Sequence, residues 1–138
     1  MMITNFPLMI VAFLAYNAVI FGIAPDQLYW GRVIFSQDMP SGAIWDLRLH
    51  DLMVILGLFL LFFEILKATR VGKLSIVDHL LSTIVLIAFI IEFLVVQAAG
   101  TSTFLILTLM ALIDVMAGFS VSIRSATRDV SLGDGSGL

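Results

Sequence analysis

Residues 101–123 read TSTFLILTLMALIDVMAGFSVSI, and this stretch decides what kind of fold the chain adopts. It contains a single ionisable residue, Asp114, and no proline. A transmembrane helix needs about 20 consecutive, mostly apolar residues. Arg124 and Arg128 follow shortly after the run, and basic residues commonly flank the ends of spans. We therefore predict that residues 101–123 form a membrane-spanning helix.

Three more apolar runs precede this one, at about residues 6–24, 49–66 and 75–99. Asn5 is positioned to cap the first run. Of the 138 residues, 61% are hydrophobic and only 12% are charged, whereas soluble domains average about half apolar and a quarter charged. We predict an all-α membrane protein, a four-transmembrane-helix bundle formed by residues 1–130. Residues 131–138 are rich in Gly and Ser and are predicted to be a flexible cytoplasmic tail.

The longest connection, residues 25–48, joins the first two spans and is rich in aromatic residues. Apolar and polar residues nearly alternate from Ala43 to His50, a pattern that favours a β-strand. Residues 38–42 have the composition of a turn. We predict a short extracytoplasmic β-hairpin at the membrane surface, with Trp30, Trp45 and Tyr29 at the level of the lipid headgroups.

The lysines and arginines orient the predicted spans, because cytoplasmic loops carry an excess of positive charge. One side of the membrane receives Lys67, Arg70, Lys73, Arg124 and Arg128. The other side receives only Arg32 and Arg48. The distribution predicts that both termini and residues 67–74 lie in the cytoplasm, with the 25–48 loop outside.

Small residues mark places where two helices can approach closely. On the first span, Ala15, Ala18 and Gly22 share one face at helical spacing. Gly57 on the second span and Gly118 on the fourth are further small residues of this kind. We predict that these five residues lie at helix–helix contacts, within this chain or with a partner.

Ionisable residues inside the predicted spans are the candidates for a functional site, because each costs at least about 2.5–3.5 kcal/mol at a span centre on insertion scales. The candidates are Asp114, Glu92, Glu64 and His50. With a rise of about 1.5 Å per residue, Glu92 is expected in the outer third of the membrane, Asp114 near the midplane and Glu64 nearer the cytoplasm. The three carboxylates would then form a ladder across the bilayer.

Each candidate also has a structural interpretation. Glu64 can pair with Lys67, one turn further along the same helix. Glu92 can form a structural hydrogen bond, and Asp114 can be hydrogen-bonded to Asn17 or to a hydroxyl group. No basic residue of the chain is expected at the depth of Asp114.

Several classes of function lack the residues that they require. The chain has no cysteine, which excludes disulfides, thiol nucleophiles and thiolate metal sites. His50 and His79 start different spans on opposite sides, so they are expected more than about 25 Å apart and unable to ligate one haem. His79 is expected to pair with Asp78 at the membrane surface. No catalytic motif, metal motif, cofactor or nucleic-acid site is predicted.

The stretches LLFFEILKATR (60–70) and ALIDVMAGFSVSIRSATRDV (111–130) carry a resemblance that extends over most of the chain. The chain resembles the uncharacterised small four-span inner-membrane proteins of alphaproteobacteria. The resemblance implies the bacterial inner membrane as the compartment but implies no activity.

Three functions remain open at this point. The first is a non-enzymatic membrane subunit or accessory protein, which contacts lipid and either other subunits or further copies of itself. The second is a small oligomeric transporter or channel, coupled to protons through the intramembrane carboxylates. The third, a membrane-embedded enzyme or a quinone-binding redox subunit, has the least support. The small size and the absence of catalytic motifs favour the first.

Overall fold

The computed structural model describes residues 6–23, 27–69 and 73–133. Along the chain, helix α1 (Met9–Ala18) continues into a π-helical segment η2 (Val19–Ile23), and a 3-10 turn η3 (Gln27–Gly31) follows. Strands β1 (Val33–Asp38) and β2 (Ile44–Arg48) come next. The remaining elements are α2 (Leu49–Ala68), α3 (Lys73–Val95), the 3-10 turn η4 (Gln97–Ala99) and α4 (Ser102–Gly133).

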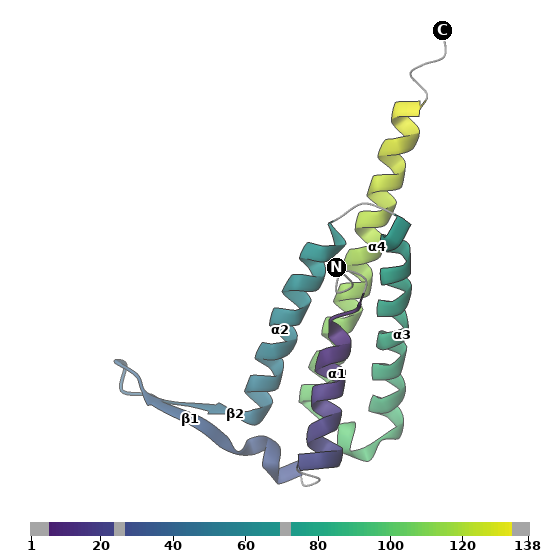
Figure 1. Cartoon of the computed structure of the whole chain (residues 1–138). Helices are drawn as coiled ribbons and strands as arrows, with labels where there is room; N and C mark the ends of the chain where they lie inside the picture. The colour runs from purple at the N-terminus through teal and green to yellow at the C-terminus, as the bar shows by residue number, and fades with distance from the viewer. Residues whose placement is uncertain (1–5, 24–26, 70–72, 134–138) are drawn as a thin grey trace.

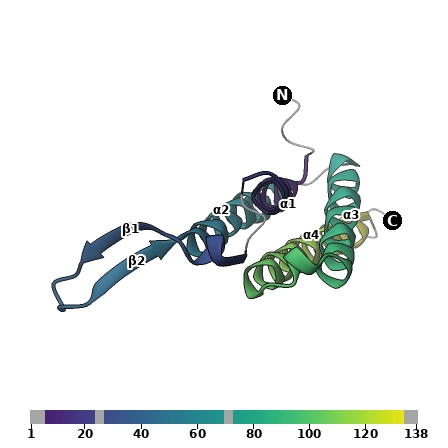
Figure 2. The same cartoon turned by 90° about the horizontal axis from the view of Figure 1, so that it is seen from below.

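The four α-helices lie side by side in one bundle (Figure 1). Helix α4 packs against both α2 and α3, and α1 packs mainly against α2. Seen along the helices, α1 lies at one side of the bundle, and the hairpin β1–β2 projects away from the bundle (Figure 2). The hairpin leaves the bundle at the end where α2 begins, and α4 extends beyond the bundle at the opposite end (Figure 1).

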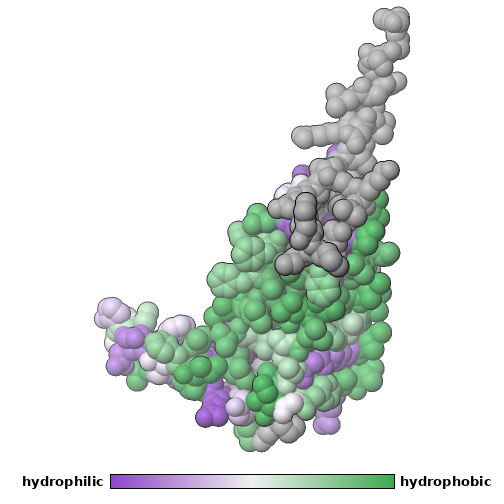
Figure 3. Space-filling view, viewed as in Figure 1, coloured by the Kyte–Doolittle hydropathy of each residue, from purple (hydrophilic) through white to green (hydrophobic). Residues whose placement is uncertain are grey.

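Three of the helices are long and apolar enough to cross a membrane: Leu49–Ala68, Ile76–Val95 and Ser102–Arg124. The first apolar helix is shorter and covers Met9–Ile23. Large apolar side chains cover the outside of the bundle (Figure 3), and some are nearly uncovered, such as Leu94 at 75% exposed and Ile76 at 70%. Such a surface suits lipid rather than water, so the predicted class of membrane protein is supported, whereas a complete set of four spans is not established.

The helix boundaries differ from the predicted ones in several places. Helix α1 begins at Met9 rather than at residue 6, and Asn5, the predicted cap, lies outside the described residues. The third span ends at Val95, because the chain there turns into η4. Helix α4 runs to Gly133, ten residues beyond the predicted end of the fourth span, and so includes the first three residues of the predicted tail. The second span begins at Leu49 as predicted.

The predicted β-hairpin is confirmed. Strands β1 and β2 pair antiparallel, with Phe35 opposite Leu47 and Gln37 opposite Trp45. Gly42 adopts a φ of 84° in the turn, a conformation that is far less costly for glycine than for other residues. The rings of Phe35 and Trp45 meet edge to face on one side of the hairpin, with centroids 6.2 Å apart.

Aromatic packing fills the bundle near the hairpin end. Tyr16 is fully buried and its ring stacks on Trp30, with centroids 4.5 Å apart. Its hydroxyl lies 2.6 Å from Oγ1 of Thr101 and donates to the carbonyl of Ala98 at 3.3 Å. Because a buried phenol needs a partner, these bonds fix α1 against the turn between α3 and α4.

Candidate functional site

The central feature of the interior is a group of charged side chains that we call the Lys67 cluster: Glu64, Lys67, Asp78 and Asp114. Helix α2 contributes the first two from its last turns, which places them on the same side at i and i+3. Nζ of Lys67 lies 2.8 Å from Oε1 of Glu64. This ion pair confirms the predicted contact, but Glu64 is only 1% exposed and does not extend to the membrane surface.

Lys67 also connects other elements of the bundle. Its Nζ lies 2.9 Å from Oδ1 of Asp78 on α3 and donates to the carbonyl oxygen of Phe6 at 2.8 Å. Oε2 of Glu64 accepts a hydrogen bond from the backbone N–H of Leu8 at 3.0 Å. Leu8 precedes α1, where backbone N–H groups have no partner within the helix. One lysine and one glutamate therefore hold the start of α1, the end of α2 and the start of α3 together.

Asp114 joins the cluster from α4 and is 4% exposed. The hydroxyl of Ser82 on α3 hydrogen-bonds to its carboxyl group, and Glu64, Lys67 and Asp78 are near enough to act on it electrostatically. The prediction that no cation reaches the depth of Asp114 is therefore wrong, because Lys67 comes from another helix. Oδ2 of Asp114 is buried without a hydrogen-bond partner among the described residues.

Glu92 lies apart from this cluster. It is 14 residues beyond Asp78 on α3, which corresponds to about 21 Å along the helix. Asn17 donates to its Oε2 at 3.1 Å and to the carbonyl of Phe13 at 3.0 Å, so Asn17 pairs with Glu92 and not with Asp114. The two groups are separated by apolar side chains, including the buried Val85, Leu86, Phe89, Phe104 and Leu107. The predicted ladder of carboxylates is therefore interrupted.

His79 lies inside the bundle rather than at its surface, where the sequence analysis placed it. It is 5% exposed, and its ring lies 6.0 Å from that of Phe119 between centroids. A Cβ added at Gly118 would collide with the imidazole of His79, so the absence of a side chain there lets α3 and α4 approach. Asp78 is buried as well, and it pairs with Lys67.

Gly57 has the same effect between α2 and α4. A Cβ at this position would lie 2.6 Å from Cδ2 of Leu107 and 2.8 Å from Sδ of Met110. On α1, by contrast, Ala15 is partly buried and Ala18 is exposed, and Gly22 is exposed in the following segment η2. A Cβ added at Gly22 would meet nothing within 4 Å. The small-residue face of α1 and η2 is therefore largely uncovered in the described part of the chain.

His50 lies at the other end of the bundle from the Lys67 cluster, where α2 begins. Its Nδ1 lies 3.0 Å from the carbonyl oxygen of Trp30, and its Nε2 lies 3.1 Å from Oδ1 of Asp51. Both side chains are more than a third exposed. Among the described residues, no group of three histidines, cysteines or carboxylates could hold a metal ion.

Sequence reasoning missed Lys67, Asp78 and Ser82 as members of the site. The helical spacing of Asp78 and Ser82 placed them on one face of the third span, so that signal was present in the sequence. Lys67 was assigned to the membrane surface because it ends an apolar run. No family model, curated protein or solved structure matches the chain.

Proposed function

We propose that this chain is a non-enzymatic integral subunit or accessory protein of a larger complex in a bacterial inner membrane. The observation that carries the proposal is that the buried charged side chains bind one another across neighbouring helices. Lys67 is bound by Glu64, by Asp78 and by the carbonyl of Phe6, so its charge joins helices instead of facing a cavity. Groups occupied in this way are poor candidates for catalysis, and the site supports a scaffold.

The proposed topology is a bundle of four transmembrane helices with both termini in the cytoplasm. The apolar helix Met9–Ile23 is about 22 Å long at 1.5 Å per residue. A bilayer core is about 30 Å thick and can thin locally around a short helix at modest cost. Reporter fusions after Gly72 and Leu138 should report the cytoplasm, and a fusion after Gly42 should report the outside. A cytoplasmic signal after Gly42 would overturn this orientation.

The uncovered face of α1 and η2 is the proposed contact with a second membrane chain or another copy. Ala18 and Gly22 are exposed there, and small residues allow another helix backbone to approach. Ala18→Leu and Gly22→Leu should each weaken assembly, measured as the size of the complex that is purified in mild detergent.

Ser120→Leu is the matched control, since it adds similar bulk at an exposed small residue of α4. It should leave the size of the complex unchanged. Complexes of the parent size in both α1 variants would show that this face contacts lipid only, and the proposed contact would fail.

A second function, that of a small oligomeric proton-coupled transporter or channel, is supported by one observation. Oδ2 of Asp114 and Oε1 of Glu92 are both buried without hydrogen-bond partners among the described residues. The apolar layer between these two residues argues against a continuous path within one chain.

Two variants of Asp114 separate the two functions. Asp114→Asn keeps the shape of the side chain but cannot release a proton, whereas Asp114→Leu removes both the charge and the hydrogen bonding. A scaffold should assemble with Asn and lose stability with Leu. A transporter should assemble with Asn but lose proton flux in liposomes, so assembly in detergent and flux in liposomes are measured on both variants.

A further inference from the structure

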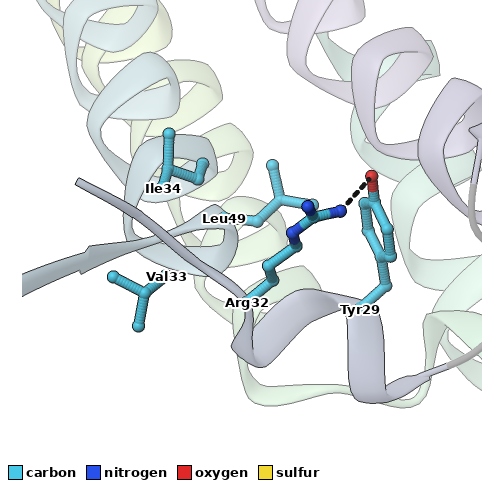
Figure 4. Close-up of a pocket in the computed structure, with 5 residues that line it drawn as sticks. All are labelled: Tyr29, Arg32, Val33, Ile34 and Leu49. Atoms are coloured by element: carbon cyan, nitrogen blue, oxygen red, sulfur yellow. Dashed lines mark hydrogen bonds between the residues drawn. The ribbon is translucent and has the colours of Figure 1, made fainter.

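Arg32 is held in a fixed position at the point where the hairpin joins the bundle (Figure 4). Its backbone N–H donates to the carbonyl of Tyr29 at 3.1 Å, and its own carbonyl accepts from the N–H of Leu49 at 3.2 Å. Its Nη1 lies 3.4 Å from the hydroxyl of Tyr29, and its guanidinium carbon lies 5.5 Å from the centroid of the same ring. The arginine and the tyrosine thus present their polar groups together.

The guanidinium has no anionic partner within residues 6–23, 27–69 and 73–133. The ion pairs in these ranges involve Lys67 and His50 only. Of the carboxylates near the hairpin, Asp46 accepts from the hydroxyl of Ser36, and Asp51 accepts from the backbone N–H of Arg48. Because a planar guanidinium suits phosphate oxygens, the unpaired charge favours a phosphate group as its partner.

A cavity of about 330 Å³ opens beside Arg32 and is lined by Tyr29, Arg32, Val33, Ile34 and Leu49. Apart from the arginine and the tyrosine, this lining is aliphatic, and Ile34 is 52% exposed. Leu49 is the first residue of the apolar helix α2, and Leu52 lies one turn further on and is 44% exposed. The cavity therefore lies where the apolar helix α2 begins, which is the level of the lipid phosphates in the membrane embedding proposed above.

We propose that Arg32 and Tyr29 bind the phosphate group of a phospholipid in the leaflet next to the hairpin. Arg32 supplies two N–H donors, and the hydroxyl of Tyr29 supplies a third. The volume is at the small end of ligand sites, so it accommodates the phosphate and glycerol while the acyl chains run along Leu49 and Leu52. The inference rests on the membrane embedding proposed above.

The test measures how dioctanoyl phosphatidylglycerol binds to the full chain in detergent, by native mass spectrometry over a series of lipid concentrations. Arg32→Gln should weaken binding by about ten-fold or more, since a hydrogen bond to a charged group is lost. Tyr29→Phe should weaken it by a smaller factor. Arg48→Gln is the matched control, because it removes the same charge from the other arginine near the hairpin and should bind like the parent.

Two further probes identify the source of the phosphate. Dioctanoylglycerol, which lacks phosphate, should bind more weakly than the phospholipid, and inorganic phosphate should not compete at equal concentration. The proposal is overturned if Arg32→Gln binds the phospholipid as tightly as the parent, or if Arg32→Gln and Arg48→Gln lose the same affinity. It is also overturned if dioctanoylglycerol binds as tightly as the phospholipid, or if inorganic phosphate competes fully. Failure of the embedding itself would appear separately, as release of the parent chain from membranes by alkaline carbonate without detergent.

Discussion

Replacing Lys67 by methionine tests whether the charge cluster holds the helices together. The change keeps a long apolar side chain and removes the ammonium group, which lies 2.8 Å from Glu64 and 2.9 Å from Asp78. These carboxylates are 1% and 6% exposed, so water does not replace the lost partner. Removing one member of a buried ion pair costs about 3–5 kcal/mol. Glu64 keeps its bond from the N–H of Leu8, so we expect about 3 kcal/mol.

The free energy of unfolding can be measured by titrating the purified protein in mixed micelles with dodecyl sulfate and following helicity by circular dichroism. A loss of about 3 kcal/mol is a large fraction of the roughly 5–15 kcal/mol that stabilises a typical domain. Lys67→Arg should be much less destabilising, since it retains the charge and its donors.

A triple variant, Lys67→Met with Glu64→Gln and Asp78→Asn, supplies the decisive comparison. It removes the charges of both carboxylates that pair with Lys67, so neither is left as an unpaired buried charge, which is the costly result of removing one partner alone. We therefore expect the triple variant to be more stable than Lys67→Met alone. The reasoning is refuted if the two variants lose the same stability, or if Lys67→Met loses less than about 1 kcal/mol.

Two further predictions concern packing. Gly118→Ala should destabilise the bundle by about 1–3 kcal/mol, because the new Cβ would force the ring of His79 to move; Gly31→Ala, where a Cβ meets nothing within 4 Å, should be tolerated in the same dodecyl sulfate titration. Tyr16→Phe should cost about 0.5–1.5 kcal/mol through loss of the hydrogen bond with Thr101. An unchanged unfolding midpoint for Gly118→Ala or Tyr16→Phe would show that the corresponding contact does not contribute to stability.

The sequence by itself determined the helical elements and the hairpin. Hydropathy identified the apolar helices α2, α3 and α4, because a span needs a run of apolar residues that is visible without any tertiary information. The alternation before His50, together with the turn composition of residues 38–42, was sufficient to predict the hairpin. Boundaries were less accurate, since a helix such as α4 continues into polar sequence when nothing breaks it.

Only the tertiary structure decided which polar side chains meet. Helical periodicity places residues on a face but does not say which helix lies opposite that face or at what height. It therefore allowed Asn17 as a partner of Asp114, whereas the packing of α1 against α3 brings Asn17 to Glu92. Lys67 was assigned to the surface because it ends an apolar run, and the sequence does not show which helices surround it. Its long side chain turns into the bundle, where it pairs with two buried carboxylates, Glu64 from α2 and Asp78 from α3.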